Sequence, residues 1–165
     1  GSWEVYFSPE LGGPGKVSFN ELTDWTTSKD ERIKYYSGSA TYNKTFQFTP
    51  EKNSSYAIQL ENVLDVGVAK IKINGTDKGV VWTKPFRVDV TNELVDGENR
   101  LEVEVINSWY NRVAGDEMNP RPDQITKTNI VLINDFRGKP TEKISLEPSG
   151  LLGPVTIKMT EQTAL

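Results

Sequence analysis

Ten residues that follow a predicted β-strand gather the side chains that a sugar site requires. Residues 107–116 hold two aromatic residues, two amides, an arginine and an acid. A pyranose presents hydroxyl groups in fixed directions and an apolar C–H face, so its site combines amide and guanidinium donors with an aromatic plate. The side chains that offer this chemistry are Asn107, Trp109, Asn111, Arg112 and Asp116.

A purely structural role is the alternative for this segment. Trp109 would then cap the core, and Arg112 would pair with Asp116 as a local brace. In both cases we expect Arg112 to hold the long loop through charge-assisted hydrogen bonds, with Asp116 as its partner. Asn107 and Asn111 are expected to brace or line the same site.

Three more aromatic residues are candidates for this site. Trp25 lies in a polar stretch, which favours an exposed ring. Tyr35 and Tyr36 begin a strand, where neighbouring side chains point to opposite faces, so at most one of them reaches a ligand, and we select Tyr36. Trp82 follows a strand and precedes Pro85, so ligand contact and closure of the open end of the fold are both open for it.

The composition excludes several classes of function. A net charge of −4 with scattered acids provides no basic stripe, so nucleic acid and anionic membranes are not expected as partners. The chain has no cysteine and no histidine, which excludes a disulfide framework, a thiolate metal site and a Ser–His–Asp arrangement. No apolar run reaches the ~18 residues that span a bilayer, and no signal peptide is visible.

Alternation of apolar and polar residues, the pattern of half-buried strands, runs through most of the chain. Asn74-Gly75 lies between two such runs and is a strong hairpin signal. Short strands without crossover helices predict an all-β fold, an antiparallel two-sheet sandwich of jelly-roll rather than immunoglobulin type. The strands are expected within residues 3–7, 40–48, 56–60, 68–73, 78–82, 86–90, 101–105, 130–132 and 155–159.

Two connections are too long for hairpin turns, residues 12–34 and 107–129. Long loops on a compact scaffold are usually functional or form interfaces, and we expect helix only as short turns within them. A length of 165 residues suits one domain, which we place at residues 3–161.

Several short motifs occur in an order that is typical of one protein family. They are Trp25 and residues 35–42, 73–75, 79–91, 107–112 and 149–155. Together they resemble the β-sandwich sugar-binding domain of the glycoside hydrolase family two kind. More narrowly, they resemble the carboxy-terminal domain of large bacterial α-L-rhamnosidases and their relatives. The resemblance spans nearly the entire chain.

The resemblance implies a galactose-binding-like jelly roll that accompanies a catalytic barrel elsewhere in the same polypeptide. A chain of 165 residues cannot contain a (β/α)₈ barrel of about 250 residues, so we expect an excised, non-catalytic module. Its own acids form no recognisable pair for glycoside hydrolysis. Those near loops or aromatic residues are Asp24, Glu61, Asp65, Asp116 and Glu117.

Two hypotheses about function follow. In the first, the loop aromatics with Asn111 and Arg112 bind carbohydrate, weakly in isolation because a site shared between domains loses contacts when it is cut out. In the second, the domain only docks on the catalytic domain of its parent chain and stabilises it. The parent is expected in the periplasm or outside the cell. No cofactor is expected, and a structural calcium ion is left open.

Overall fold

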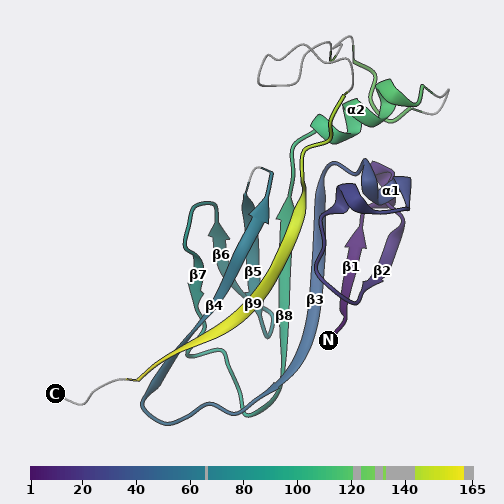
Figure 1. Ribbon diagram of the computed structural model, residues 1–165. Coiled ribbons are helices and arrows are strands. Elements are labelled where there is room, and N and C mark those ends of the chain that lie inside the picture. The colour runs from purple at the N-terminus through teal and green to yellow at the C-terminus, as the bar shows by residue number, and fades with distance from the viewer. Residues whose placement is uncertain (66, 121–123, 129–131, 133–143, 162–165) are drawn as a thin grey trace.

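The chain folds into two antiparallel β-sheets that pack face to face (Figure 1). The computed structural model describes residues 1–65, 67–120, 124–128, 132 and 144–161. The two-sheet jelly-roll sandwich predicted from the sequence is confirmed. The six-stranded sheet has the order β2 (Gly15–Phe19), β1 (Trp3–Phe7), β3 (Ser39–Phe48), β8 (Gly97–Ile106), β5 (Val68–Ile73) and β6 (Thr76–Val81). The three-stranded sheet has the order β7 (Phe86–Asp89), β4 (Ser54–Leu64) and β9 (Gly150–Glu161).

The alternation in the sequence creates the core between these sheets. In β1 every second residue, Trp3, Val5 and Phe7, is buried, and the residues between them are exposed. Because side chains alternate across a strand, each strand of this kind supplies one apolar face. The long central strand β4 faces the larger sheet with Ile58 and Leu60, both 1% exposed.

The hairpin predicted at Asn74-Gly75 joins β5 to β6. Ile73 pairs with Thr76, so the turn has two residues. Both have positive φ angles, 50° for Asn74 and 83° for Gly75, which is the conformation that a tight hairpin turn requires. The Asn74 side chain also donates to Asn99 Oδ1 at 2.8 Å, which ties the turn to the start of β8.

The structure differs from the expected strands in residues 12–34 and at Leu132. Residues 12–34 are not only a connection, because they contain β2, which pairs with β1 along its whole length. Of the strand expected over residues 130–132, residues 130 and 131 lie outside the described part of the chain, and Leu132 is in no strand.

Helices are short and lie at one end of the sandwich (Figure 1). They are the 3₁₀ turns η1 (Pro9–Leu11) and η2 (Trp25–Thr27) and the α-helices α1 (Glu31–Lys34) and α2 (Tyr110–Met118). Within the described residues, no helix is long and apolar enough to cross a membrane. The strand β8 leads into α2, and β9 starts beside α2 and runs to the opposite end of the sandwich.

Candidate functional site

The predicted sugar-site segment forms the helix α2 and the turn before it. Residues 107–129 were expected to be a long loop, but Tyr110–Met118 form a nine-residue helix. One side of α2 is packed against the sandwich, with Asn111, Arg112, Ala114, Gly115 and Asp116 buried. The polar side chains chosen from the sequence are therefore largely beneath the surface.

The amide of Asn107 fastens β8 to the segment before β3. Its Oδ1 accepts from the Gly38 backbone N–H at 2.9 Å. Its Nδ2 donates to the Tyr36 carbonyl at 2.9 Å and to Ser149 Oγ at 3.3 Å. Both amide hydrogens are used within the protein, so Asn107 braces the site rather than lining it.

The amide of Asn111 fastens α2 to the segment that leads into β9. Its Nδ2 donates to the Glu147 carbonyl at 2.7 Å and to Ser149 Oγ at 2.8 Å, and its Oδ1 accepts from Glu147 N–H at 2.9 Å. Ser149 N–H in turn donates to Asp24 Oδ1 at 3.0 Å. Ser149 thus joins α2, β8 and the η2 turn in one buried network.

Arg112 and Asp116 lie on the same buried side but serve different contacts. The Arg112 backbone N–H donates to Ser37 Oγ at 3.0 Å, and its Nη2 donates to the Leu11 carbonyl at 3.5 Å. The Asp116 carboxylate accepts from Thr126 N–H at 2.9 Å and from the Thr126 hydroxyl at 2.5 Å. The ion pairs of the described residues do not include Arg112 with Asp116, so the predicted brace between them is wrong. Arg112 is 3% exposed, and Asp116 holds the chain after α2.

Two of the predicted aromatic residues are exposed at this end of the fold. Trp109, directly before α2, is 50% exposed, and Trp82, directly after β6, is 71% exposed. The strands β6 and β8 both pair antiparallel with β5 and end where β5 begins, so the two residues lie at the same end of the larger sheet. Trp82 therefore does not plug the sandwich, and Trp109 does not cap the core.

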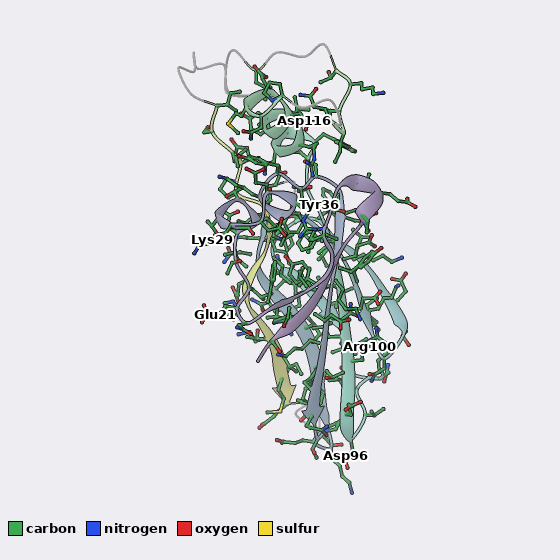
Figure 2. The ribbon with its side chains drawn as sticks, turned by 90° about the vertical axis from the view of Figure 1, so that its right-hand side faces the viewer. Glu21, Lys29, Tyr36, Asp96, Arg100 and Asp116 are labelled. Atoms are coloured by element: carbon green, nitrogen blue, oxygen red, sulfur yellow. The ribbon has the colours of Figure 1, made fainter. Side chains whose placement is uncertain are left out.

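The other two aromatic residues are in the core. Trp25 was expected to be exposed but is 1% exposed, and its Nε1 donates to the Tyr42 hydroxyl oxygen at 2.6 Å. Tyr36 is fully buried, and its hydroxyl accepts from Ser8 N–H and donates to the Ser39 carbonyl. Both rings pack edge-on against Phe7 at centroid distances of 5.2 and 5.0 Å. Neither ring forms a surface that a ligand could reach. Figure 2 shows Tyr36 among the surrounding side chains.

A small pocket is lined by Ser108 and Tyr110, the residues on either side of Trp109 in the sequence. It has a volume of about 290 Å³ and is lined by Asp65, Ser108, Tyr110 and Glu147. Asp65 Oδ2 accepts from Ser108 N–H at 2.6 Å and from the Ser108 hydroxyl at 2.7 Å. Asp65 has a φ of 65°, an unusual conformation for a non-glycine residue that clusters at functional sites. The contact spans 43 residues, so only the fold brings these groups together.

Four of the acids singled out from the sequence accept hydrogen bonds from neighbouring groups. Asp24 caps η2 through Thr26 N–H, and Glu61 accepts from Gln59 Nε2. Asp65 and Asp116 are held by Ser108 and Thr126 as described above. Where the structure is described, no three acidic side chains lie together as a set that could hold a metal ion.

The side chains of Tyr36 and Tyr42 are shielded from solvent in the core. Burial raises the pKa of Tyr42 to about 12, although hydrogen bonds from Leu151 N–H and Trp25 Nε1 act in the opposite direction. Burial also raises the pKa of Tyr36. Both phenols stay protonated at neutral pH and act as structural hydrogen-bonding groups.

Comparison with known proteins relates the whole chain to large glycosidases. No family model matches the chain. A curated protein of Formosa agariphila, named "Putative beta-glucuronidase", is 37% identical over all of this chain and 16% of its own length. The rhamnosidase structure from Novosphingobium sp. PP1Y is 34% identical, with a TM-score of 0.81 over 97% of this chain and 14% of that one.

More distant structures share the fold alone. The β-glucuronidase from Ruminococcus gnavus is 20% identical, with a TM-score of 0.54 over 65% of this chain and 20% of its own. That from Bifidobacterium dentium is 21% identical, with a TM-score of 0.52 over 64% of this chain and 19% of its own. The chain spans about a sixth of the length of the curated relative it matches. It is a β-sandwich domain of a larger glycoside hydrolase, and it is similar to a region of the Novosphingobium rhamnosidase.

Proposed function

We propose that this chain is a non-catalytic accessory domain that contacts carbohydrate within a larger glycoside hydrolase. The observation that carries the proposal is the exposed indole of Trp109, whose sequence neighbours Ser108 and Tyr110 line a pocket together with Asp65 and Glu147. An aromatic face next to oxygen groups suits a pyranose, which has an apolar face and a rim of hydroxyls. The likeness to a rhamnosidase over 97% of the chain supports a carbohydrate ligand.

In this proposal the buried polar residues are positioning residues. Asn107 and Asn111 fix the turn that carries Trp109 by using both hydrogens of each amide inside the protein. Arg112 fixes α2 against Ser37 and Leu11. A rigid base lowers the entropy lost when a ligand immobilises the indole ring. Trp82, at the same end, is available for a second sugar unit.

The proposal assigns the hydrolytic chemistry to another part of the parent enzyme. Hydrolysis of a glycoside needs two carboxylates about 5–10 Å apart that can exchange protons with the substrate. Asp65 and Asp116 are each held by two hydrogen bonds from one neighbour. The carbohydrate and the catalytic domain of the parent are thus the proposed partners. An enzyme that degrades extended glycans meets them outside the cytoplasm, so we propose a periplasmic or extracellular location for the parent.

Titration with oligosaccharides tests the proposal. Rhamnose-containing and galactose-containing oligosaccharides are expected to bind the isolated chain with millimolar affinity, about −4 kcal/mol, because half of a shared site is missing. Trp109→Ala is expected to weaken this binding at least tenfold, with Tyr6→Ala as the control for an exposed aromatic outside the site. Equal binding by the wild type and Trp109→Ala would place the ligand elsewhere.

A second candidate function is architectural, and one observation favours it. A cleft of about 620 Å³ with mainly apolar walls lies between the two sheets, and neither Trp109 nor Trp82 lines it. A domain whose only task is docking would need such a surface and would not need the Trp109 site. Two results together would favour this alternative: no oligosaccharide binds in any titration, and the cleft is covered in the full-length parent.

A further inference from the structure

The two sheets of the sandwich differ in width, which leaves one side of the core open. Six strands form one sheet and three form the other, and β9 is the edge of the smaller sheet. In Figure 1 the β1–β2 hairpin extends beyond β9, and no strand of the smaller sheet lies over it. Between them lies a cleft of about 620 Å³ with apolar walls. Its lining includes Trp3, Leu22, Phe46, Leu152, Val155 and Ile157.

The edge of β9 runs along this cleft with one row of backbone groups directed away from β4. β9 pairs with β4 from Ser54↔Glu161 to Leu64↔Gly150, and in the described part of the chain it has no strand on its other side. The Leu151 N–H already donates to the Tyr42 hydroxyl oxygen, and Pro154 has no N–H. The edge available for pairing is therefore the stretch from Val155 onward. An exposed long edge strand is a surface to which other strands add.

The cleft does not suit a sugar. The ring of Trp3 is only 8% exposed, and Lys44 lies over it, with Nζ 5.6 Å from the ring centroid. Lys44 Nζ also donates to the Ser2 carbonyl at 2.8 Å, which holds it in place. The aromatic face is thus covered, and the other walls are mainly aliphatic. Apolar side chains on an extended backbone fit such a surface, because β9 supplies the hydrogen bonds and the cleft supplies the burial.

The comparisons indicate where such a strand would come from. This chain covers 14% of the rhamnosidase and 16% of the curated relative, so most of each relative lies outside the matching region. Gly1 also lines the cleft. Glu21, at the border of the cleft, is exposed and lies near β9 in Figure 2. Together with Lys44 it gives the rim one charge of each sign.

We propose that an extended apolar segment from a neighbouring domain of the same polypeptide adds to the edge of β9 and fills this cleft. The inference rests on the proposed function in one respect, namely that the chain is part of a larger enzyme. It assigns the docking surface to the open side of the sandwich and leaves the Trp109 end free for carbohydrate. The domain would then contact its neighbour and its ligand with different surfaces.

Cysteine labelling tests the proposal, because the chain has no cysteine of its own. Val155→Cys and Leu22→Cys place a thiol on each wall of the cleft. Val80→Cys is the matched control, since Val80 lies in β6 at the far edge of the larger sheet, is 53% exposed and is not among the residues that line the cleft. The rate of maleimide labelling is measured in the isolated chain and in the full-length parent, with the parent lacking the added cysteine as background.

The expected result is labelling of both cleft thiols at least tenfold slower in the parent than in the isolated chain, with no change at Val80→Cys. Equal rates in both proteins would overturn the proposal. Protection already present in the isolated chain, and increasing with its concentration, would also overturn it, because a second copy would then be the occupant. Thermal unfolding of each variant verifies the fold. Sugar titration of the same samples is independent of labelling, so failure of the proposed carbohydrate site is scored separately.

Discussion

The Asn111 side chain donates to Ser149 Oγ at 2.8 Å, across 38 residues of sequence, and this bond joins α2 to the entry of β9. Asn107 Nδ2 donates to the same oxygen at 3.3 Å. Ser149 itself is fully buried, and its hydroxyl donates a hydrogen bond to the Glu147 carbonyl at 3.0 Å. The polar residues that suggested a ligand site in the sequence are thus the internal frame of that end of the domain.

Removing this frame is expected to destabilise the domain. Asn111→Ala removes the acceptor of the Glu147 N–H and one of the two donors to the Glu147 carbonyl, at a cost of about 1–3 kcal/mol in the free energy of unfolding. Urea unfolding followed by circular dichroism measures the change. Asn119→Ala, an exposed amide at the end of the same helix, is the control and should change the free energy by less than about 0.5 kcal/mol. Equal stability of both variants would show that the network contributes nothing.

Gly115 allows α2 to approach the ring of Tyr35. A Cβ at this position would lie 2.6 Å from Tyr35 Cγ, closer than real contacts permit. In an ordinary helix, alanine in place of glycine gains about 1 kcal/mol, but here the overlap is expected to dominate. Gly115→Ala should therefore lower the free energy of unfolding by about 1–3 kcal/mol. In the control Gly153→Ala the new methyl would meet Leu22 at an ordinary 3.5 Å, and a stabilised Gly115→Ala would contradict the packing.

Alkaline pH is expected to destabilise the domain through Tyr42. Burial raises the folded-state pKa of this phenol to about 12, above the ordinary tyrosine value of 10.0. Above pH 10 the unfolded state loses this proton while the folded state keeps it, so the free energy of unfolding falls until the pH passes 12. A shift of this size corresponds to about 3 kcal/mol. Urea titrations between pH 9 and 12 measure the slope.

Tyr42→Phe distinguishes this contribution from those of the other tyrosines. The variant should show a shallower loss of stability above pH 10. At neutral pH it should be less stable by about 1–3 kcal/mol, since Trp25 Nε1 and Leu151 N–H lose their acceptor. An unchanged alkaline slope would contradict the assignment to Tyr42.

Most of the fold could be predicted from local pattern, whereas most of the site could not. Strands such as β1 alternate strictly, and Asn74-Gly75 fixes its hairpin through backbone conformation alone. The strand β2 was missed because only Val17 and Phe19 are large apolar residues in it, within a connection rich in polar residues and glycine. Its pairing with β1 decides its conformation, and that pairing is not a local property.

Exposure of the aromatic residues depends on contacts that are distant in sequence. Trp25 has polar neighbours, yet its ring packs against Gly150, where a Cβ would lie 2.5 Å from Nε1. Asp65 reaches Ser108 over 43 residues, so the pocket that these two residues line has no sequence signature. Residue type indicated carbohydrate chemistry at this end, but only the fold shows which side chains remain at the surface.

The isolated chain is expected to release no aglycone from aryl glycosides. This follows because the acids near the site are occupied by structural hydrogen bonds and no histidine is present to shuttle a proton. A panel of aryl glycosides that includes rhamnosides and galactosides should give rates equal to the blank. Turnover that survives purification and disappears in Asp65→Asn, Asp24→Asn, Glu61→Gln, Asp116→Asn or Glu117→Gln would overturn the non-catalytic assignment.

The central claim, that carbohydrate contacts Trp109, is tested most directly by the indole N–H signals in an NMR titration with oligosaccharides. The chain has four tryptophans, and their signals are assigned with single Trp→Phe variants. The Trp109 signal is expected to shift with a millimolar dissociation constant, while that of Trp25, buried and bonded to Tyr42, stays in place. An oligosaccharide that binds and leaves the Trp109 signal unchanged would contradict the account.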